Sequence, residues 1–167
     1  AIVPETLLET VNNLVEWPYV MLGEMDDKYL SLPQALIAEV FHTHQKCFHL
    51  VDENQQTLPY FLLVNHIPST DPKHVLIDYQ RVIHARLSDA QFFFSADLKL
   101  SEEYYAHSLK NMSFHPKLGT MQEKLIRIIA LTRVMAAQIQ YPIDTSLSFL
   151  PKIKNDLCSQ TVNEFPS

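Results

Sequence analysis

The sequence predicts an α+β fold, in which a helix and an antiparallel hairpin come first and a helical portion follows. Two observations carry this prediction. Up to about residue 65, segments in which apolar residues recur at every second position are separated by turn residues, which is typical of strands. Beyond residue 71, helix-start signals and apolar residues at three-and-four spacing prevail. We therefore predict an α+β region over residues 1–105 and an all-helical region over residues 106–167.

The strands of the first region are predicted from alternation and from turn residues. The first expected strand covers Trp17–Leu22 and ends at Gly23. From Lys46 onward the apolar period changes from helical to alternating, which indicates a second strand. Asp52–Gln55 is turn-like, and Leu58–Val64 has the composition of a third strand. The last two strands are expected to pair as an antiparallel hairpin.

Helix-start signals recur in the rest of the chain. Asp71-Pro72 is an N-cap followed by proline at the first helical position. Ser88-Asp89 is expected to cap another short helix. Thr120 and Glu123 have the spacing of a capping box, in which each side chain bonds the backbone amide of the other residue.

Apolar residues at helical spacing predict the buried faces of these helices. In the helix after Pro72 the stripe consists of Val75, Leu76, Tyr79, Val82 and Ile83. In the helix after Thr120 it consists of Met121, Leu125, Ile128, Thr132, Met135 and Ile139. Tyr141-Pro142 ends that helix, and a last helix is expected to start near Asp144 or Ser148.

Composition limits the classes of function. Hydrophobic residues make up 47% of the chain and no apolar run is long enough to cross a bilayer, so we expect a globular protein without membrane contact. With only two glycines, glycine-rich phosphate loops are excluded. The net charge of −6 argues against a free-standing nucleic-acid binder but allows a module of a larger RNA-binding surface. The chain has no signal peptide and no initiator methionine, so we expect a piece of a longer protein.

Histidines raise two hypotheses of metal binding. Three of them lie close together in the sequence: His42, His44 and His49. They form no HExxH motif, and two histidines two residues apart on a helix point about 200° apart, which is poor for chelation. His115 and Asp156 match two of four ligand positions of metal-dependent HD-type phosphohydrolases, and Asn155 stands where a second histidine is needed. We therefore favour a helical bundle with a vestigial pocket and assign no metal.

Other reactive groups lack a motif, so no catalytic residue is assigned. Cys47 and Cys158 form no CxxC, and two reduced thiols are the simpler interpretation. Arg86 suits a phosphate contact, and an ion pair with Asp89 is an equal alternative. The aromatic run Phe92–Phe94 is more typical of a core or an inter-domain seam than of a base-stacking platform.

Seven segments carry recognisable phrases, in this order: Val15–Pro18 (VEWP), Met25–Pro33, His44–Leu50 (HQKCFHL), Thr57–Phe61, Arg81–Phe93, Phe114–Thr120 and Lys154–Pro166. Their ordered set covers nearly the whole chain and resembles the β subunit of bacterial glycyl-tRNA synthetase. The chain departs from the family at Asp78-Tyr79-Gln80, where the family has G-N-E, and at His84, which replaces an arginine. Cys47 replaces a tyrosine of the family.

The resemblance implies a part in the ATP-dependent attachment of glycine to tRNA. In this family the α part holds the catalytic core, which uses ATP and Mg, and the β part binds tRNA and contains a degenerate HD-like helical domain. The resemblance therefore implies no cofactor in this segment, tRNA-Gly and the α subunit or α part as partners, and a cytoplasmic location.

The residues that we expect to contact RNA are Lys46, Arg81, Arg86 and Lys117. Two alternatives stay open beside this reading. One is a metal-dependent HD-type phosphohydrolase. The other is a structural module that contacts the α part and no RNA.

Overall fold

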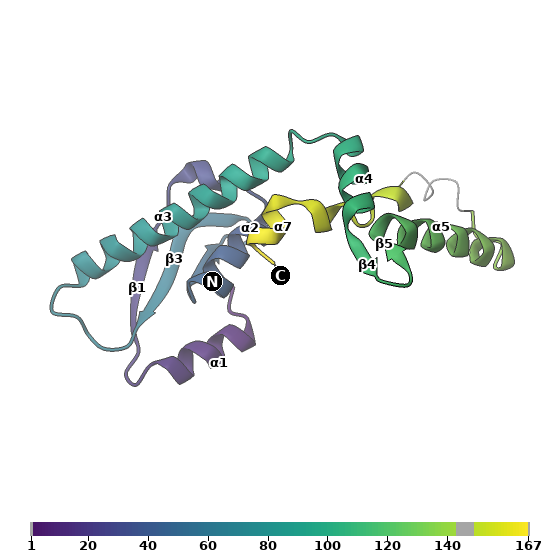
Figure 1. Cartoon of the computed structure of the whole chain (residues 1–167). Helices are drawn as coiled ribbons and strands as arrows, with labels where there is room; N and C mark the ends of the chain where they lie inside the picture. The colour runs from purple at the N-terminus through teal and green to yellow at the C-terminus, as the bar shows by residue number, and fades with distance from the viewer. Residues whose placement is uncertain (1, 143–148, 167) are drawn as a thin grey trace. The chain divides into compact units, whose positions relative to one another are not determined.

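The computed structural model describes residues 2–142 and 149–166 and confirms the α+β class (Figure 1). The chain divides into two compact units, Ala1–Phe94 (unit 1) and Ser95–Pro166 (unit 2). The division falls inside the helix α3 (Pro72–Asp97), earlier than the boundary at residue 105 that we placed from the sequence. Within the part of the chain that the structure describes, no helix is both long and apolar enough to span a membrane.

Unit 1 is a three-stranded antiparallel sheet with helices around it. Its elements in chain order are α1 (Glu5–Leu14), β1 (Tyr19–Glu24), the 3-10 helix η1 (Asp27–Ser31), α2 (Gln34–Glu39), the π-helix η2 (Val40–His44), β2 (Phe48–Val51), β3 (Thr57–Asn65) and α3 as far as Phe94. The strand order is β1–β3–β2, so the expected hairpin of β2 and β3 is present and β3 is central.

Strand β1 differs from the expected Trp17–Leu22 because Gly23 lies inside it. Gly23 pairs with Phe61 on β3, and a Cβ at Gly23 would overlap the ring of Phe61. Glycine here marks a close side-chain approach within a strand and not the end of the strand. Trp17, which we expected inside the strand, precedes it and is 71% exposed.

The two faces of the sheet are covered differently. On one face α1 packs Leu7 and Val11 against Phe48, with Leu62 and Val64 beside them. On the other face Phe61 is fully buried and contacts the ring of Phe41, at 5.2 Å between ring centroids. Helix α3 is tied to β1 by the Gln80 side chain, which donates to the Glu24 carbonyl at 2.9 Å.

A histidine pair lies within this core. His49 on β2 is 2% exposed, and its Nδ1 lies 3.0 Å from Nε2 of His42 on η2. Burial and the neighbouring His42 lower the pKa of His49 to about 4. Because one ring donates and the other accepts, the pair is satisfied only while at least one imidazole is neutral.

Helix α3 is one continuous helix of 26 residues, so the separate short helix expected after Ser88-Asp89 is wrong. No glycine or proline follows Pro72 in it, and both Ser88 and Asp89 are exposed, where they do not interrupt the helix. Its buried stripe is Ile83, Leu87 and Ala90. Val82, which we placed in the stripe, is 48% exposed.

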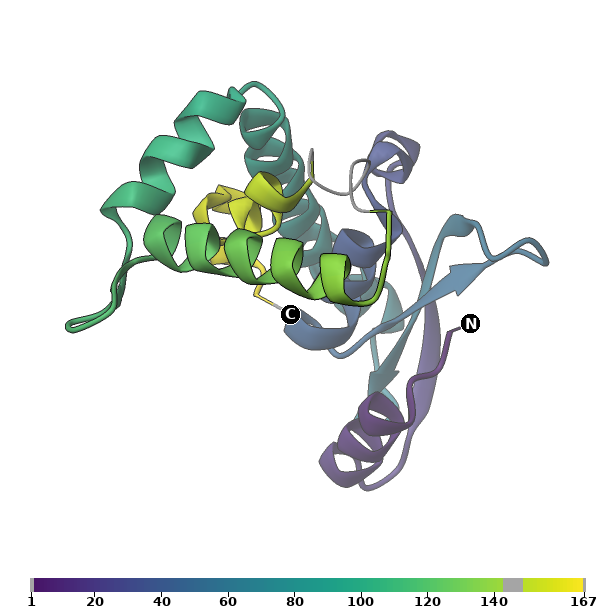
Figure 2. The ribbon, with the colours of Figure 1, turned by 90° about the vertical axis from the view of Figure 1, so that its right-hand side faces the viewer.

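Unit 2 is mostly helical but contains a short two-stranded ribbon, which the sequence analysis did not anticipate. Its elements are α4 (Glu102–Asn111), β4 (Ser113–His115), β5 (Gly119–Thr120), α5 (Met121–Gln138), the 3-10 helices η3 (Leu150–Lys152) and η4 (Asn155–Cys158), and α7 (Gln160–Glu164). Strands β4 and β5 pair antiparallel and extend away from α4 and α5 (Figure 2). The core joins Leu109 of α4 to Met121 and Leu125 of α5, with Leu157 and Cys158 against them.

The capping box at the start of α5 is confirmed, because both of its hydrogen bonds are present. The predicted stripe holds only for the first turns. Met121 and Leu125 are buried, whereas Met135 is 55% exposed and Ile139 is 74% exposed. The expected start of a last helix near Asp144 or Ser148 lies outside the described residues.

The carboxylate of Asp97 holds the start of α7. It accepts hydrogen bonds from the Ser159 hydroxyl (2.8 Å), the Gln160 amide (2.9 Å), and the Thr161 amide and hydroxyl (2.8 and 2.6 Å). Burial raises the pKa of the Asp97 carboxyl, but these hydrogen bonds outweigh burial and keep the pKa below its ordinary value. The last residue of α3 thus caps α7 from outside.

We expect the buried His49 of this histidine pair to make the protein acid-labile. The folded pKa of His49 lies below its unfolded value, so its contribution to stability is present above about pH 6.5 and is lost as pH falls toward 4. The free energy of unfolding should drop by about 2 kcal/mol between pH 7 and pH 5, measured by urea denaturation. His49→Gln should flatten this slope, and His107→Gln, at an exposed position, should not. An unchanged slope in His49→Gln would contradict the assignment.

Replacing the Asp97 carboxylate should loosen unit 2. In Asp97→Asn the amide NH₂ faces donors that need an acceptor, so we expect a loss of about 1–3 kcal/mol in the free energy of unfolding at pH 7. Because the folded pKa is depressed, the contribution of Asp97 is lost only as pH falls through that lowered pKa. Asp156→Asn, at an exposed carboxylate, is the matched control. Equal stability of the two variants would argue against the role of Asp97.

Candidate nucleic-acid interface

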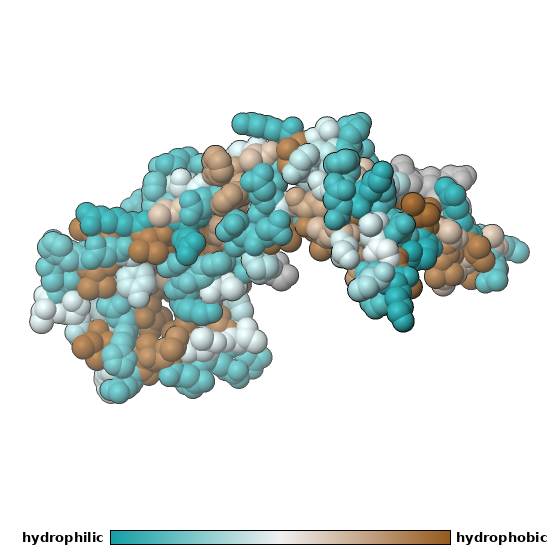
Figure 3. Space-filling view, in the orientation of Figure 1, coloured by the Kyte–Doolittle hydropathy of each residue, from teal (hydrophilic) through white to brown (hydrophobic). Residues whose placement is uncertain are grey.

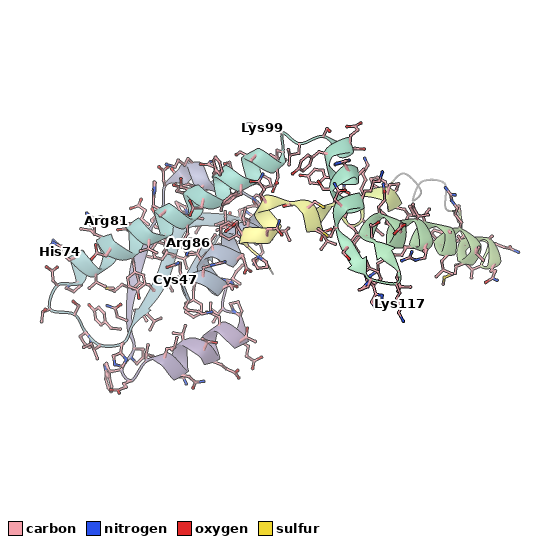
Figure 4. The ribbon with its side chains drawn as sticks, in the orientation of Figure 1. Cys47, His74, Arg81, Arg86, Lys99 and Lys117 are labelled. Atoms are coloured by element: carbon pink, nitrogen blue, oxygen red, sulfur yellow. The ribbon has the colours of Figure 1, made fainter. Side chains whose placement is uncertain are left out.

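The four residues predicted to contact RNA are all exposed but lie on separate elements (Figure 4 labels three of them). Lys46 follows η2 in a left-handed backbone conformation, with φ of 54°. Arg81 and Arg86 lie on α3, and five residues along a helix place them about 140° apart, on different sides. Lys117 lies in the turn of the β4–β5 ribbon. Arg81 and Arg86 therefore do not share one side of α3, and Lys117 belongs to the other unit.

Arg81 borders a cavity of about 420 Å³ in unit 1, and its charge is balanced there. Its guanidinium lies 3.3 Å from the carboxylate of Asp78. The other charged side chains of the cavity wall include Glu24 and Asp26. The alternative partner considered for Arg86, Asp89, does not occur among the ion pairs of the described residues. Arg86 is thus open to a phosphate, whereas Arg81 is held by an acid.

A small polar network occupies the same cavity. The Lys28 ammonium lies 3.2 Å from Asp26 and 3.4 Å from Nε2 of His84. Hydrogen bonds from Lys28 lower the pKa of Asp26, and the bond to Asp26 raises the pKa of Lys28. The buried Tyr29 places its hydroxyl 3.1 Å from the same nitrogen of His84 and 3.2 Å from the His84 carbonyl. Because Lys28 is paired with Asp26, this cavity offers little uncompensated positive charge.

Lys117 has a different environment. It borders a hollow of about 560 Å³ at the start of α5, together with Arg127 and the apolar side chains of Leu118 and Ile126. On the next part of α5, the Lys124 ammonium lies 3.9 Å from the ring centroid of Phe114, a cation–π contact. Cations and exposed apolar side chains are thus interleaved on the ribbon and the first turns of α5.

One acid, Glu123, borders the same hollow as Lys117 and Arg127. Glu123 accepts a hydrogen bond from the Thr120 amide at 2.7 Å, and its own amide donates to the Thr120 hydroxyl at 3.3 Å. Its charge is therefore directed at the start of α5, where a carboxylate is favourable. Lys117, Lys124 and Arg127, which we call the basic patch, take part in none of the ion pairs of the described residues.

Charge is distributed unevenly along the chain. The first 94 residues contain five Lys and Arg against twelve Asp and Glu, a net charge of −7. Between Glu103 and Asp144 there are five cations, Lys110, Lys117, Lys124, Arg127 and Arg133, and a single acid, Glu123. The sequence analysis selected Lys117 but missed Lys124 and Arg127. A count of charge over this stretch, instead of over the whole chain, is the signal that points to them.

The residues considered for metal binding do not converge. His115 lies exposed on β4, where its Nδ1 accepts a hydrogen bond from the Lys117 amide at 3.1 Å, and Asp156 lies in η4. His42 and His49 form the pair described above. Across residues 2–142 and 149–166, no three His, Cys, Asp or Glu side chains gather in a way that would hold a metal ion.

Both cysteines are free thiols. Cys47 is buried, and burial raises the pKa of its thiol to about 12. Cys158 lies against the core of unit 2, and burial raises the pKa of its thiol as well. Thiols with raised pKa values hold their protons at neutral pH, so neither cysteine is prepared to act as a nucleophile.

A basic surface with interleaved apolar side chains, carried by an otherwise acidic α+β chain, is typical of one module of a larger nucleic-acid-handling protein. Comparison with known proteins gives the family. A family model described as "Glycyl-tRNA synthetase beta subunit" matches residues 1–167. The chain belongs to the glycyl-tRNA synthetase β-subunit family.

Curated relatives agree with this assignment. The chain is 39% identical over 169 residues to "Glycine--tRNA ligase beta subunit" of Coxiella burnetii, covering 100% of this chain and 24% of that protein. It is 39% identical to the protein of the same name from Hahella chejuensis and 36% identical to that from Trichodesmium erythraeum, covering 99% and 98% of this chain and 24% of each relative. The chain thus spans about a quarter of the length of these relatives.

The geometry at the start of α5 can be tested at Gly119. Gly119 has φ of +83°, and a Cβ there would overlap the carboxylate of Glu123. Gly119→Ala should therefore break the capping box and lower the free energy of unfolding by about 1–3 kcal/mol, measured by urea denaturation. Glu123→Gln, which keeps the capping geometry, should cost less. Equal losses in the two variants would contradict this account.

Proposed function

We propose that this chain supplies tRNA contacts and scaffolding within a glycine–tRNA ligase, and that the basic patch in unit 2 contacts phosphates of tRNA-Gly. The proposal rests on family membership and on one observation: between Glu103 and Asp144 the sequence has five cations and a single acid, Glu123, which accepts a hydrogen bond from the Thr120 amide. Phosphate contacts need uncompensated Lys and Arg side chains, and exposed apolar groups beside them suit ribose and base surfaces.

In this proposal the chemistry of ligation belongs to other parts of the assembly. The name of the relatives, a β subunit, supports a partnership with an α subunit. Glycine activation with ATP and Mg would take place in that α part, and this segment would carry no catalytic residue and no cofactor. A cytoplasmic location follows from the same proposal.

The residues chosen from the sequence take different places in this proposal. Lys117 belongs to the basic patch. Arg86 is a second candidate for a phosphate, because it is exposed on α3. Arg81 pairs with Asp78, and Lys46 lies within the acidic unit 1, so both are weaker candidates.

Salt-dependent tRNA binding tests the proposal. In the full-length β subunit with its α subunit, Lys117→Ala/Lys124→Ala/Arg127→Ala should weaken binding of tRNA-Gly and lower the slope of log K against log salt by roughly 2–3, because up to three phosphate contacts are lost. Gel shifts or filter binding at several salt concentrations give both quantities.

A charge-matched control removes other cations. Lys46→Ala/Lys73→Ala/Arg81→Ala deletes the same charge from unit 1 and should change affinity and slope less. Thermal unfolding of both triple variants checks that each is folded. If the patch variant binds like the wild type while the α subunit is still bound, the segment is a structural module and the proposed RNA contact is wrong.

A further inference from the structure

One edge of the sheet in unit 1 is open. Strand β1 pairs with β3, and no second strand pairs with β1 among the residues that the structure describes. At the opposite edge, β2 has a partner from its own chain, because the Ile2 amide donates to the His49 carbonyl at 3.3 Å. The outer edge of β2 thus has a backbone hydrogen bond from its own chain, whereas the outer edge of β1 has no strand partner among the described residues.

The register shows which backbone groups of β1 face outward. The Met25 amide donates to the Pro59 carbonyl at 2.9 Å, and the same register pairs Gly23 with Phe61 and Met21 with Leu63. Alternate residues of an antiparallel strand direct their N–H and C=O groups to opposite sides.

The N–H and C=O groups of Val20, Leu22 and Glu24 thus point away from β3. The Glu24 carbonyl accepts the Gln80 side-chain amide, which agrees with this direction. Val20 and Leu22 are left with both backbone groups at the open edge.

The side chains of the same two residues are apolar and unusually exposed. Val20 and Leu22 each expose 56% of their surface, and Trp17, just before β1, exposes 71%. They lie on the same face of the sheet as their register partners, Val64 and Leu62. On this face, α1 packs against β2 and β3 and leaves β1 uncovered. Figure 3 shows apolar side chains at the surface in this region of α1 and β1. Native proteins normally shield an apolar edge strand, since it recruits other strands.

We propose that the edge of β1 pairs with an additional strand supplied by a further segment of the same β-subunit polypeptide, outside these 167 residues. The backbone row at Val20 and Leu22 fits an extended strand, because only a strand offers N–H and C=O groups at matching spacing. The proposal rests on family membership and not on the proposed RNA contacts.

The chemistry of the partner strand follows from what flanks the open edge. Apolar side chains at alternate positions would continue the face formed by Val20 and Leu22. Glu16 lies before β1 and Glu24 ends it, and neither carboxylate takes part in the ion pairs of the described residues. Lys or Arg near the two ends of the added strand would therefore complement it.

The relatives support the same polypeptide as the source of the strand. Their β subunits are about four times as long as the matched region, which covers 24% of them. A strand tethered in the same chain is present at a high effective concentration, so it occupies the edge more fully than a separate protein of equal affinity. An α subunit or a second copy of the chain would fill the edge only on association.

Amide hydrogen exchange of the full-length β subunit, without α, tests the proposal. The Val20 and Leu22 amides should exchange at least about tenfold more slowly than the amide of Glu53 in the β2–β3 turn, and at a rate near that of Leu63 in the central strand. Exchange as fast as that of Glu53 overturns the proposal. Protection that appears only with the α subunit, or only at high protein concentration, overturns it as well.

A proline variant gives an independent measurement. Leu22→Pro removes the outward N–H and leaves the hydrogen bonds between β1 and β3 in place, because the backbone N–H and C=O of Leu22 point away from β3. In the full-length β subunit it should speed exchange at Val20 at least about tenfold relative to Leu22→Ala, which keeps the N–H. Unchanged exchange at the central Leu63 shows that the sheet is folded. Equal exchange at Val20 in the two variants overturns the proposal.

Discussion

The contact between the ring of Phe61 and the backbone of Gly23 is the constraint on which unit 1 depends. It places a fully buried aromatic ring over the one position of β1 that has no side chain. Because side chains alternate across a strand, it also fixes Met21 on the inner face and turns Val20 and Leu22 to the other. The same ring meets Phe41, which packs beside His49, so the histidine pair also depends on this contact.

Unit 2 depends on two carboxylates that accept hydrogen bonds at the starts of helices. Asp97 gathers four donors at the start of α7, and Glu123 closes the capping box of α5 over Gly119. The second of these has a consequence for charge. Glu123 bonds the Thr120 amide, and among the described residues it forms no ion pair with Lys117, Lys124 or Arg127. A local folding interaction thereby leaves a basic surface on a chain whose net charge is −6.

Features that depend on neighbours in sequence could be predicted, and features that depend on distant neighbours could not. The capping box of Thr120 and Glu123 needs only residues three apart, and it is present as expected. Gly23 was interpreted as a strand end, because the sequence does not reveal that Phe61 lies across from it. Ser88-Asp89 has the composition of a cap, yet the buried stripe that passes through Leu87 and Ala90 keeps α3 continuous.

The candidate site divides in the same way. The family could be inferred from ordered phrases. Arg81 pairs with Asp78, three residues before it, and Lys28 pairs with Asp26, two residues before it, so both ion pairs are local and the sequence could have pointed to them. Lys117 lies in a ribbon that the sequence did not predict, beside Arg127 at the start of α5.

The two surfaces differ in how long a partner must stay on them. A basic patch is well hydrated without its ligand, so phosphates can bind and leave as salt and tRNA concentration change. An apolar edge strand is less well hydrated. Its free N–H and C=O groups readily form hydrogen bonds with another strand. We therefore expect a lasting partner at the edge of β1, whereas the patch of Lys117, Lys124 and Arg127 suits a transient one. That difference fits the two proposals, the subunit's own chain at the sheet edge and tRNA at the patch.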